Sequence, residues 1–139
     1  MRLFVLIIFL ACTGLLVACR KNGNESSKTS LNIKLHDCTG HIFRDNSINL
    51  CFDSVISDSR CPANVECIWQ GAATCKFSFL KNNGTYPLTL STLSLGPFKK
   101  DTTLLGYKIE LMNLTPYPEL PPVPLPGNVI RAEVKITRL

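Results

Sequence analysis

From Leu31 onward, apolar and polar residues alternate with a period of two, which is typical of strands that bury one face. The apolar positions of the five clearest segments are Ile48, Leu50 and Phe52; Cys75, Phe77 and Phe79; Tyr86, Leu88 and Leu90; Leu105, Tyr107, Ile109 and Leu111; and Ile130, Ala132, Val134 and Ile136. Residues 31–35 and 40–44 add one or two edge strands. Because no segment beyond residue 31 shows an apolar stripe with a period of 3.6, the pattern predicts an all-β domain over residues 31–139. We expect an antiparallel β-sandwich or open barrel of six or seven strands.

Two segments between the predicted strands carry turn or crossover signals. Asn82-Asn83-Gly84 lies between two alternating stretches and predicts a hairpin, because Asn-Gly favours tight turns. Residues 116–126 hold six of the nine prolines of the chain. Proline has no backbone N–H to donate, so this segment is excluded from a central strand and is expected to form a stiff polyproline crossover between sheets. Its alternative use is as a docking motif for an aromatic groove on a partner.

The N-terminal segment has the features of an export signal. Arg2 precedes an apolar run, Leu3–Ala18, that is shorter than the roughly 20 residues needed to span a bilayer. The end of this run, Leu16–Cys19, resembles the cleavage box of bacterial lipoproteins. The resemblance implies a cleaved signal peptide over 1–18 and a lipidated Cys19. Residues 20–30 are polar without apolar periodicity and are expected to form a flexible tether. Arg20 follows the cysteine at a position where an Asp would favour retention in the inner membrane. Its presence therefore favours the outer membrane of the cell envelope.

Composition narrows the classes of function. Hydrophobic residues make up 45% and charged residues 18% of the chain, which excludes wholesale disorder. The net charge of +5 is modest and its basic residues are scattered, so we expect no nucleic-acid partner. With two histidines and ten acidic residues in the chain, we do not expect most metal-dependent hydrolase layouts. No cofactor is expected.

Five of the seven cysteines lie in the predicted domain, and export to an oxidising compartment makes disulfides the default. Cys61 and Cys67 form the best pair, because turn-forming residues lie between them. Cys38–Cys51 is preferred among the rest, although the sequence does not choose decisively between Cys38, Cys51 and Cys75. Cys75 alternates onto an apolar face, which is typical of a buried free thiol.

Residues 58–73, Asp-Ser-Arg-Cys-Pro-Ala-Asn-Val-Glu-Cys-Ile-Trp-Gln-Gly-Ala-Ala, resemble the hallmark of a family of small, largely uncharacterised bacterial lipoproteins and secreted proteins. The shared pattern is Asp-Ser-Arg-Cys-Pro followed by Val-x-Cys-x-Trp-x-Gly-x-Ala. Residues 107–111, 116–118 and 129–139 resemble later parts of the same family pattern. The resemblance implies an architecture and an envelope location, and it carries no established activity. Cys38, Cys51 and Cys75 are not part of the pattern.

Each residue of the motif has a structural interpretation. Asp58 and Ser59 are suited to accept backbone hydrogen bonds and form a turn. The fork of Arg60 suits loop carbonyls or a nearby carboxylate, and Trp69 is expected to pack on the disulfide. Gly71 permits a bulge or a close backbone approach. The alternative is that Asp58, Ser59, Arg60 and Trp69 form a surface for a ligand or partner.

His36, Cys38 and His41 lie within six residues of one another, and imidazole and thiolate are common ligands of zinc and copper. They are the alternative candidates for a metal-binding or enzymatic role. No catalytic residues stand out. The favoured interpretation is therefore a lipid-anchored envelope protein acting as a non-catalytic binding or structural module, in contact with the membrane through its lipid and with an unnamed envelope partner. A further alternative is an inhibitor-like module that presents the Cys61–Cys67 loop to a protease or lytic enzyme.

Overall fold

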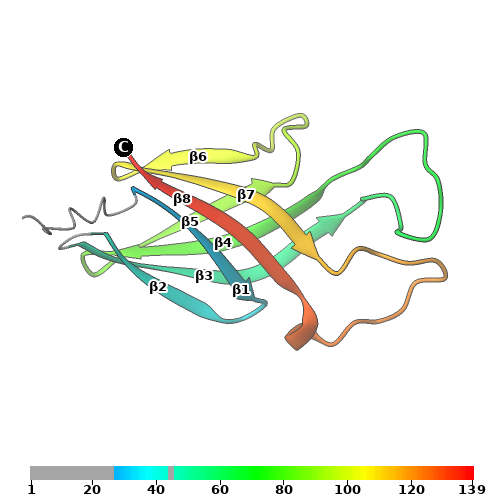
Figure 1. The fold of residues 1–139 in the computed structure, drawn as a ribbon, viewed down its shortest axis with the longest axis horizontal. Coiled ribbons are helices and arrows are strands. Elements are labelled where there is room, and N and C mark those ends of the chain that lie inside the picture. Colours follow the sequence, from blue (N-terminus) through cyan, green and yellow to red (C-terminus); the bar gives the residue numbers. More distant parts are fainter. Residues whose placement is uncertain (1–26, 44–45) are drawn as a thin grey trace, which may run out of the picture.

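The computed structural model describes residues 27–43 and 46–139, so the signal segment and Cys19 lie outside the described residues. The described part of the chain contains eight strands in two four-stranded antiparallel sheets that face each other as in a β-sandwich (Figure 1). The strands are β1 (Lys28–Lys34), β2 (Cys38–Phe43), β3 (Asn46–Asp58), β4 (Ala73–Lys81), β5 (Gly84–Ser91), β6 (Asp101–Leu104), β7 (Tyr107–Thr115) and β8 (Arg131–Arg138). One sheet has the order β1-β8-β7-β6 and the other the order β2-β3-β4-β5.

The core lies between the sheets and is built from the alternating positions that the sequence pattern identifies. Ile48, Leu50 and Phe52 of β3 are buried, and Phe77 of β4 stacks on Phe52 with ring centroids 5.1 Å apart. Each of these side chains points inward because successive residues of a strand face opposite sides of the sheet. The other members of the same cluster are Leu31, Ile33, Phe43, Ala73, Cys75, Phe79, Leu88, Leu90, Tyr107, Ile109, Leu111, Leu114, Ala132, Val134 and Ile136. The all-β class is thus confirmed.

Three details differ from the sequence prediction. The described residues form eight strands rather than six or seven, because the short strand β6 carries no apolar alternation. Leu105 is not in a strand: it occupies the turn between β6 and β7 with a φ of 50° and is exposed. Strand β1 begins at Lys28, so it includes residues that the sequence assigns to the tether, and Lys28 pairs with Thr137 of β8.

The hairpin predicted at Asn82-Asn83-Gly84 is confirmed, with a shifted turn. Lys81 of β4 pairs with Gly84 of β5, so Asn82 and Asn83 are the two turn residues. Their φ angles of 50° and 62° lie in the left-handed region, which asparagine tolerates better than most residues. Glycine is consequently a strand residue here.

Two long connections extend beyond the sheets at one end of the sandwich, on the right in Figure 1. They are the β3–β4 connection (59–72) and the β7–β8 connection (116–130), the second of which includes the 3₁₀ helix η2 (Gly127–Val129). The proline segment therefore joins neighbouring strands of one sheet, and the expectation that it crosses between sheets is wrong.

The first described residues lie at the opposite end of the sandwich from these connections. Ser27 accepts a hydrogen bond from the Arg138 N–H at 2.7 Å, which places the start of β1 beside the chain's C-terminus (Figure 1). Strand β8 has eight residues, so about 25 Å of strand separates the two ends at about 3.3 Å per residue. Within 27–43 and 46–139, no helix has the length and apolar character required to cross a membrane.

Candidate functional site at the tip

We call residues 59–72 and 116–130 together the tip. Its first segment leaves the sheet as a narrow ladder: the Ser59 N–H donates to the Ala72 carbonyl at 2.9 Å and the Cys61 N–H donates to the Gln70 carbonyl at 3.0 Å. Gly71 lies within this ladder with a φ of +63°, and a Cβ there would lie 1.8 Å from the Ser59 carbonyl oxygen. The expected close backbone approach at Gly71 is therefore confirmed, and no other residue type fits the position.

Arg60 ties the two segments of the tip together. The residue is 5% exposed, and its guanidinium forms a two-pronged ion pair with Asp58, with Nε–Oδ1 at 2.8 Å and Nη2–Oδ2 at 2.7 Å. The same group donates to the carbonyls of Leu114 and Pro116, the latter at 3.0 Å, and lies over the Tyr117 ring with 4.3 Å from Cζ to the centroid. Planar, multi-donor chemistry of this kind requires arginine rather than lysine. Arg60 thus links β3 to the proline segment.

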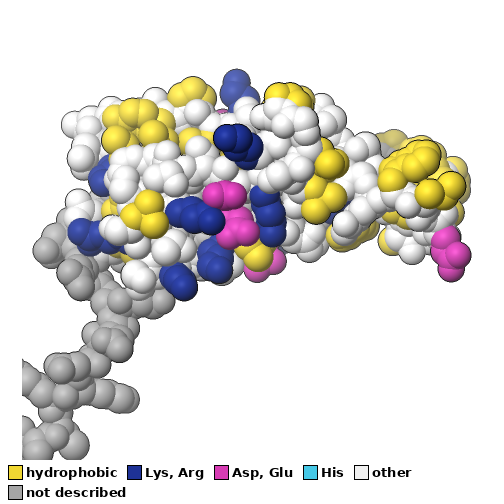
Figure 2. Space-filling model, turned by 90° about the horizontal axis from the view of Figure 1, so that it is seen from above, with side chains coloured by type: hydrophobic (Ala, Val, Ile, Leu, Met, Phe, Trp, Pro, Cys, Tyr) yellow, Lys and Arg dark blue, Asp and Glu magenta, His cyan; other side chains and the backbone are white. Residues whose placement is uncertain are grey.

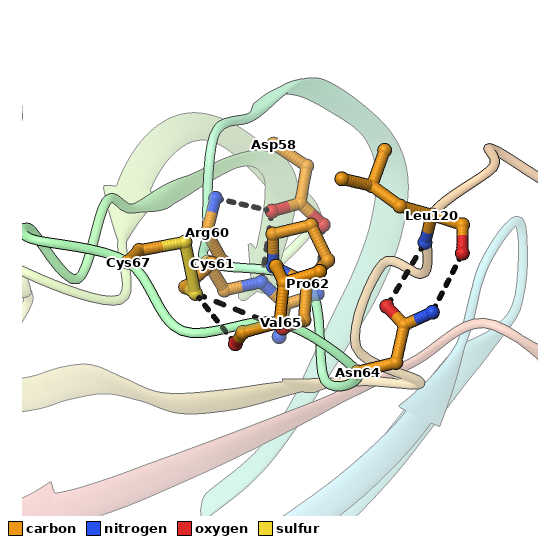
Figure 3. The surroundings of a disulfide bond; sticks show 8 residues. All are labelled: Asp58, Arg60, Cys61, Pro62, Asn64, Val65, Cys67 and Leu120. Atoms are coloured by element: carbon orange, nitrogen blue, oxygen red, sulfur yellow. Dashed lines mark hydrogen bonds and ion pairs between the residues drawn. A yellow bond between two sulfur atoms is a disulfide. The ribbon is translucent and has the colours of Figure 1, made fainter.

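A disulfide and an asparagine hold the rest of the first segment. Cys61 and Cys67 are bonded, which closes a short loop (Figure 3). Inside that loop the Asn64 side chain donates to the Leu120 carbonyl at 2.6 Å and accepts from the Leu120 N–H at 3.0 Å. The Ala63 N–H adds a hydrogen bond to the second segment. The loop is therefore held against the proline segment by these hydrogen bonds.

The tip exposes many large apolar side chains. Ile68 is 97% exposed and Trp69 is 72% exposed. The other exposed large apolar residues of the tip are Val65, Tyr117, Leu120, Val123, Leu125 and Val129. Figure 2 shows hydrophobic side chains gathered at this end of the molecule, while basic and acidic side chains mingle over part of the body on the face in view. Exposed apolar groups concentrated in this way mark interaction surfaces on soluble domains.

A groove of about 350 Å³ runs beside the second segment of the tip. Its walls come from β3, β7, the proline segment and the residue before β8. The lining residues are Val55, Asp58, Leu114, Pro116, Tyr117, Pro118, Glu119, Pro122, Val123, Leu125 and Ile130. Most of these side chains are apolar, and the volume falls within the range of about 300–1,000 Å³ that is common for ligand pockets.

The four residues proposed from sequence as a contact surface do not form one surface. The Ser59 hydroxyl donates to the Ala72 carbonyl at 3.0 Å. Arg60 and Asp58 form an internal ion pair, in which the Asp58 side chain is 25% exposed. Trp69 lies on the surface, so the expectation that it packs on the Cys61–Cys67 disulfide as a core tryptophan is wrong. The physical reason is that no second sheet faces residues 61–70, which extend past the end of the sandwich.

The structure does not bring the candidate metal ligands His36, Cys38 and His41 together as a metal site. Cys38 is bonded to Cys51 across the paired strands β2 and β3, so its sulfur is not a free thiolate ligand. His36 lies in the turn after β1 and lines a shallow hollow beside this disulfide, whereas His41 packs edge-on against Phe43 with centroids 4.5 Å apart. No group of three or more potential ligands suitable for a metal ion occurs among the residues that the structure describes.

Cys75 is the free cysteine of the described chain and lies buried in the core on β4. Burial, and to a smaller extent the negative charge of Asp58, raises the pKa of the Cys75 thiol to about 12 against the opposing effect of Arg60. Because the thiolate is the reactive form, this thiol is inert at neutral pH.

Sequence reasoning missed the contribution of the second segment to the site. Tyr117 and Leu120 contact the first segment across 56 residues or more of chain, and a proline-rich stretch has no periodicity that reveals such contacts. The signal that was present is the density of apolar residues between prolines, which a simple crossover does not require.

The comparisons with known proteins add no relative: no family model, no curated protein and no solved structure matches the chain.

Proposed function

We propose that the protein is a lipid-anchored module of the bacterial cell envelope, held in the outer membrane through Cys19, that binds a partner through its tip. The proposal keeps the family resemblance of residues 58–73 as an expectation about location. It assigns no catalytic step, since the tip presents apolar side chains and a groove rather than a nucleophile with a base.

The single observation that carries this proposal is the exposure of Ile68 and Trp69 on a segment that is otherwise held firmly. Burying both side chains in the fold would lower the free energy by about 1.5–3 kcal/mol each, yet the chain leaves them in water. The segment that bears them is held by the Cys61–Cys67 disulfide and by Arg60. A rigid display of apolar anchors is what a binding surface needs, because little conformational entropy remains to be lost on association.

The position of the tip is consistent with an anchor at Cys19. The described chain starts at Ser27, at the end of the sandwich opposite the tip. An anchor that precedes Ser27 therefore connects to the end of the sandwich opposite the tip, so the tip is the end farther from the point of attachment.

The anchor is tested by metabolic labelling with a fatty acid. We expect label on the wild-type chain and none on Cys19→Ser, with the variant released from the membrane fraction. Cys12→Ser is the matched control, because that cysteine lies within the proposed signal peptide. Equal labelling and retention of wild type and Cys19→Ser would contradict the anchor.

The contact surface is tested by photocrosslinking in intact cells. A photoreactive phenylalanine analogue replaces Trp69 on the tip or, as the matched control, Met112, which is exposed on β7 of the body. We expect one adduct of defined mass from position 69 and none from position 112. Adducts from position 112 alone would move the contact surface to the sheets.

A second candidate function is inhibition of an envelope hydrolase by the Cys61–Cys67 loop. It is favoured by the closure of that loop and by its fastening through Asn64, because standard inhibitors present a loop that is rigid before binding. Stoichiometric loss of activity of a serine protease or a lysozyme on mixing with the protein, reversed by reducing the disulfide, would support this role.

A further inference from the structure

The chemistry of the tip indicates which class of partner it accepts. Resting on the proposed function of the tip as the contact surface, we propose that its ligand is a polypeptide segment in which aliphatic side chains are interspersed with lysine or arginine. The groove takes the aliphatic side chains, and the exposed glutamates of the tip take the cationic ones.

The exposed charge on the tip is sparse and negative. Residues 61–75 contain one charged residue, Glu66, and residues 112–130 contain one, Glu119. Both glutamates are exposed, and Glu119 lines the groove. Figure 2 shows an acidic side chain beside the apolar group at this end of the molecule. The surface of the tip is therefore apolar with a negative rim.

The one basic residue of the tip does not offset these glutamates. Arg60 is buried, and its charge is balanced by Asp58 at 2.7 Å. The basic residue that follows the tip, Arg131, opens β8 and pairs with Lys34 of β1, so both belong to the sheet rather than to the tip. A cationic ligand is thus attracted at the tip without a competing positive charge on the tip's own surface.

The prolines that line the groove lack backbone hydrogen-bond donors. Pro116, Pro118 and Pro122 line the groove and have no N–H, so this part of the wall offers a ligand no backbone donor. Lysine and arginine side chains carry only donors. The Glu119 carboxylate, beside a wall with no backbone donors, therefore suits the cationic side chains of a polypeptide.

The same features disfavour a bilayer as the ligand. An exposed tryptophan and isoleucine resemble residues that enter a membrane interface, but anionic lipids repel a surface whose exposed charges are both negative. Segments that bind bacterial membranes carry lysine and arginine on their polar side. The tip carries glutamates there instead.

The chain contains a single tryptophan, Trp69, so its fluorescence reports on the tip alone. The full chain with Cys19→Ser is titrated with three 14-residue peptides: one of leucine and lysine, one of leucine and glutamate, and one of serine and lysine. Vesicles of phosphatidylethanolamine and phosphatidylglycerol in a 3:1 ratio are the fourth probe. We expect a blue shift and saturable binding with the leucine–lysine peptide, and at least about tenfold weaker binding with the other two peptides.

Variants separate charge from groove. Glu66→Lys with Glu119→Lys is expected to weaken the leucine–lysine peptide by about tenfold or more, whereas Glu133→Lys on the exposed face of β8 leaves it unchanged. Val123→Ser, at an exposed wall of the groove, is expected to weaken it without affecting the fold. Far-UV circular dichroism of each variant verifies folding.

The outcomes distinguish this inference from the function on which it rests. A blue shift with the vesicles that strengthens in the double glutamate variant would identify a membrane-inserting tip and overturn the inference, while the tip would remain the contact surface. Equal binding of the leucine–glutamate peptide would overturn the charge argument in the same way. Silence of all four probes overturns the inference as well, and crosslinks from position 112 in place of position 69 would overturn the proposed function itself.

Discussion

Side chains between the two sheets are held by their burial in a shared core, whereas those of the tip are held by a few specific links. Phe52, Phe77 and their neighbours exclude water from one another over the whole length of the sandwich. The tip has no such core, and its shape depends on Arg60, the Cys61–Cys67 disulfide and Asn64. The difference teaches that this chain maintains an ordered segment without burying that segment's apolar residues.

That separation frees the apolar residues of the tip for another use. In the body, Phe77 can become exposed only if the core is disrupted. In the tip, Trp69 and Ile68 are exposed while the backbone that bears them stays in place. Two spectroscopic signals distinguish the regions, because far-UV circular dichroism follows the strands and the fluorescence of Trp69 follows the tip.

The largest expected effect belongs to the core. Phe77→Ala removes a fully buried ring and is expected to lower the free energy of unfolding by about 3–5 kcal/mol. Urea unfolding followed by circular dichroism measures this loss, and the Trp69 signal should change at the same urea concentration, since the tip has nothing to rest on without the sheets. A loss below about 1.5 kcal/mol would show that the tip carries more of the stability than its contacts suggest.

The two disulfides compare the regions directly. Cys38–Cys51 joins β2 to β3 with a sequence separation of 13, and Cys61–Cys67 closes a loop with a separation of 6. Chain entropy predicts losses of about 3 kcal/mol and about 2.4 kcal/mol, respectively, when each pair is replaced by serine. We expect the first replacement to shift both spectroscopic signals, and the second to shift mainly the fluorescence. Identical behaviour of the two signals in both variants would contradict the independence of the tip.

The sequence predicted the body well because its information is local. Alternation assigns Ile48, Leu50 and Phe52 to the core with no knowledge of what faces them. It missed β6 because Asp101-Thr102-Thr103-Leu104 has no apolar alternation. It included Leu105 in a strand because that residue happens to have the same parity as Tyr107.

The tip could be predicted only in part, because its contacts join distant positions. The motif indicated that the fork of Arg60 suits loop carbonyls or a carboxylate at Asp58 or Glu66, and the structure pairs it with Asp58. Those carbonyls belong to Leu114 and Pro116, which lie 54 and 56 residues from Arg60 along the chain. No feature of the sequence indicates this pairing. Trp69 was assigned to the core by its proximity to a disulfide, although burial depends on whether a second sheet faces it.

Removing Arg60 should loosen the tip from the body. Arg60→Met keeps much of the side-chain volume but leaves Asp58 and two carbonyls without their donor, so we expect a loss of about 2 kcal/mol. The value lies below that of a fully buried pair because Asp58 is 25% exposed. The Trp69 signal should unfold before circular dichroism does. Lys108→Met, which breaks the exposed ion pair with Asp101, is the matched control and should cost less than about 0.5 kcal/mol.

The pH dependence of stability probes the core beneath the tip. The pKa of Cys75 rises from 9.0 to about 12 on folding, so above pH 9 the unfolded chain loses a proton that the folded chain keeps. Stability therefore falls as pH rises, by about 1.4 kcal/mol between pH 8 and pH 10 from this group. Cys75→Ala should show a correspondingly smaller fall over the same range in urea unfolding. Equal falls in both proteins would mean that water reaches this position.

The smallest expected change in stability sharpens the comparison most. Ile68 is 97% exposed and Ile48 is 1% exposed, so the same substitution samples both regions. Ile68→Ser should change the free energy of unfolding by less than about 0.5 kcal/mol, whereas Ile48→Ser should lower it by several times that amount, since it removes buried methyl groups and buries a hydroxyl. The photocrosslink from position 69 should nevertheless be lost in the Ile68→Ser background. If Ile68→Ser leaves the fold unchanged and abolishes the contact, the Ile68 side chain serves to bind a partner. An unchanged crosslink would show instead that Ile68 contributes neither to the fold nor to the contact.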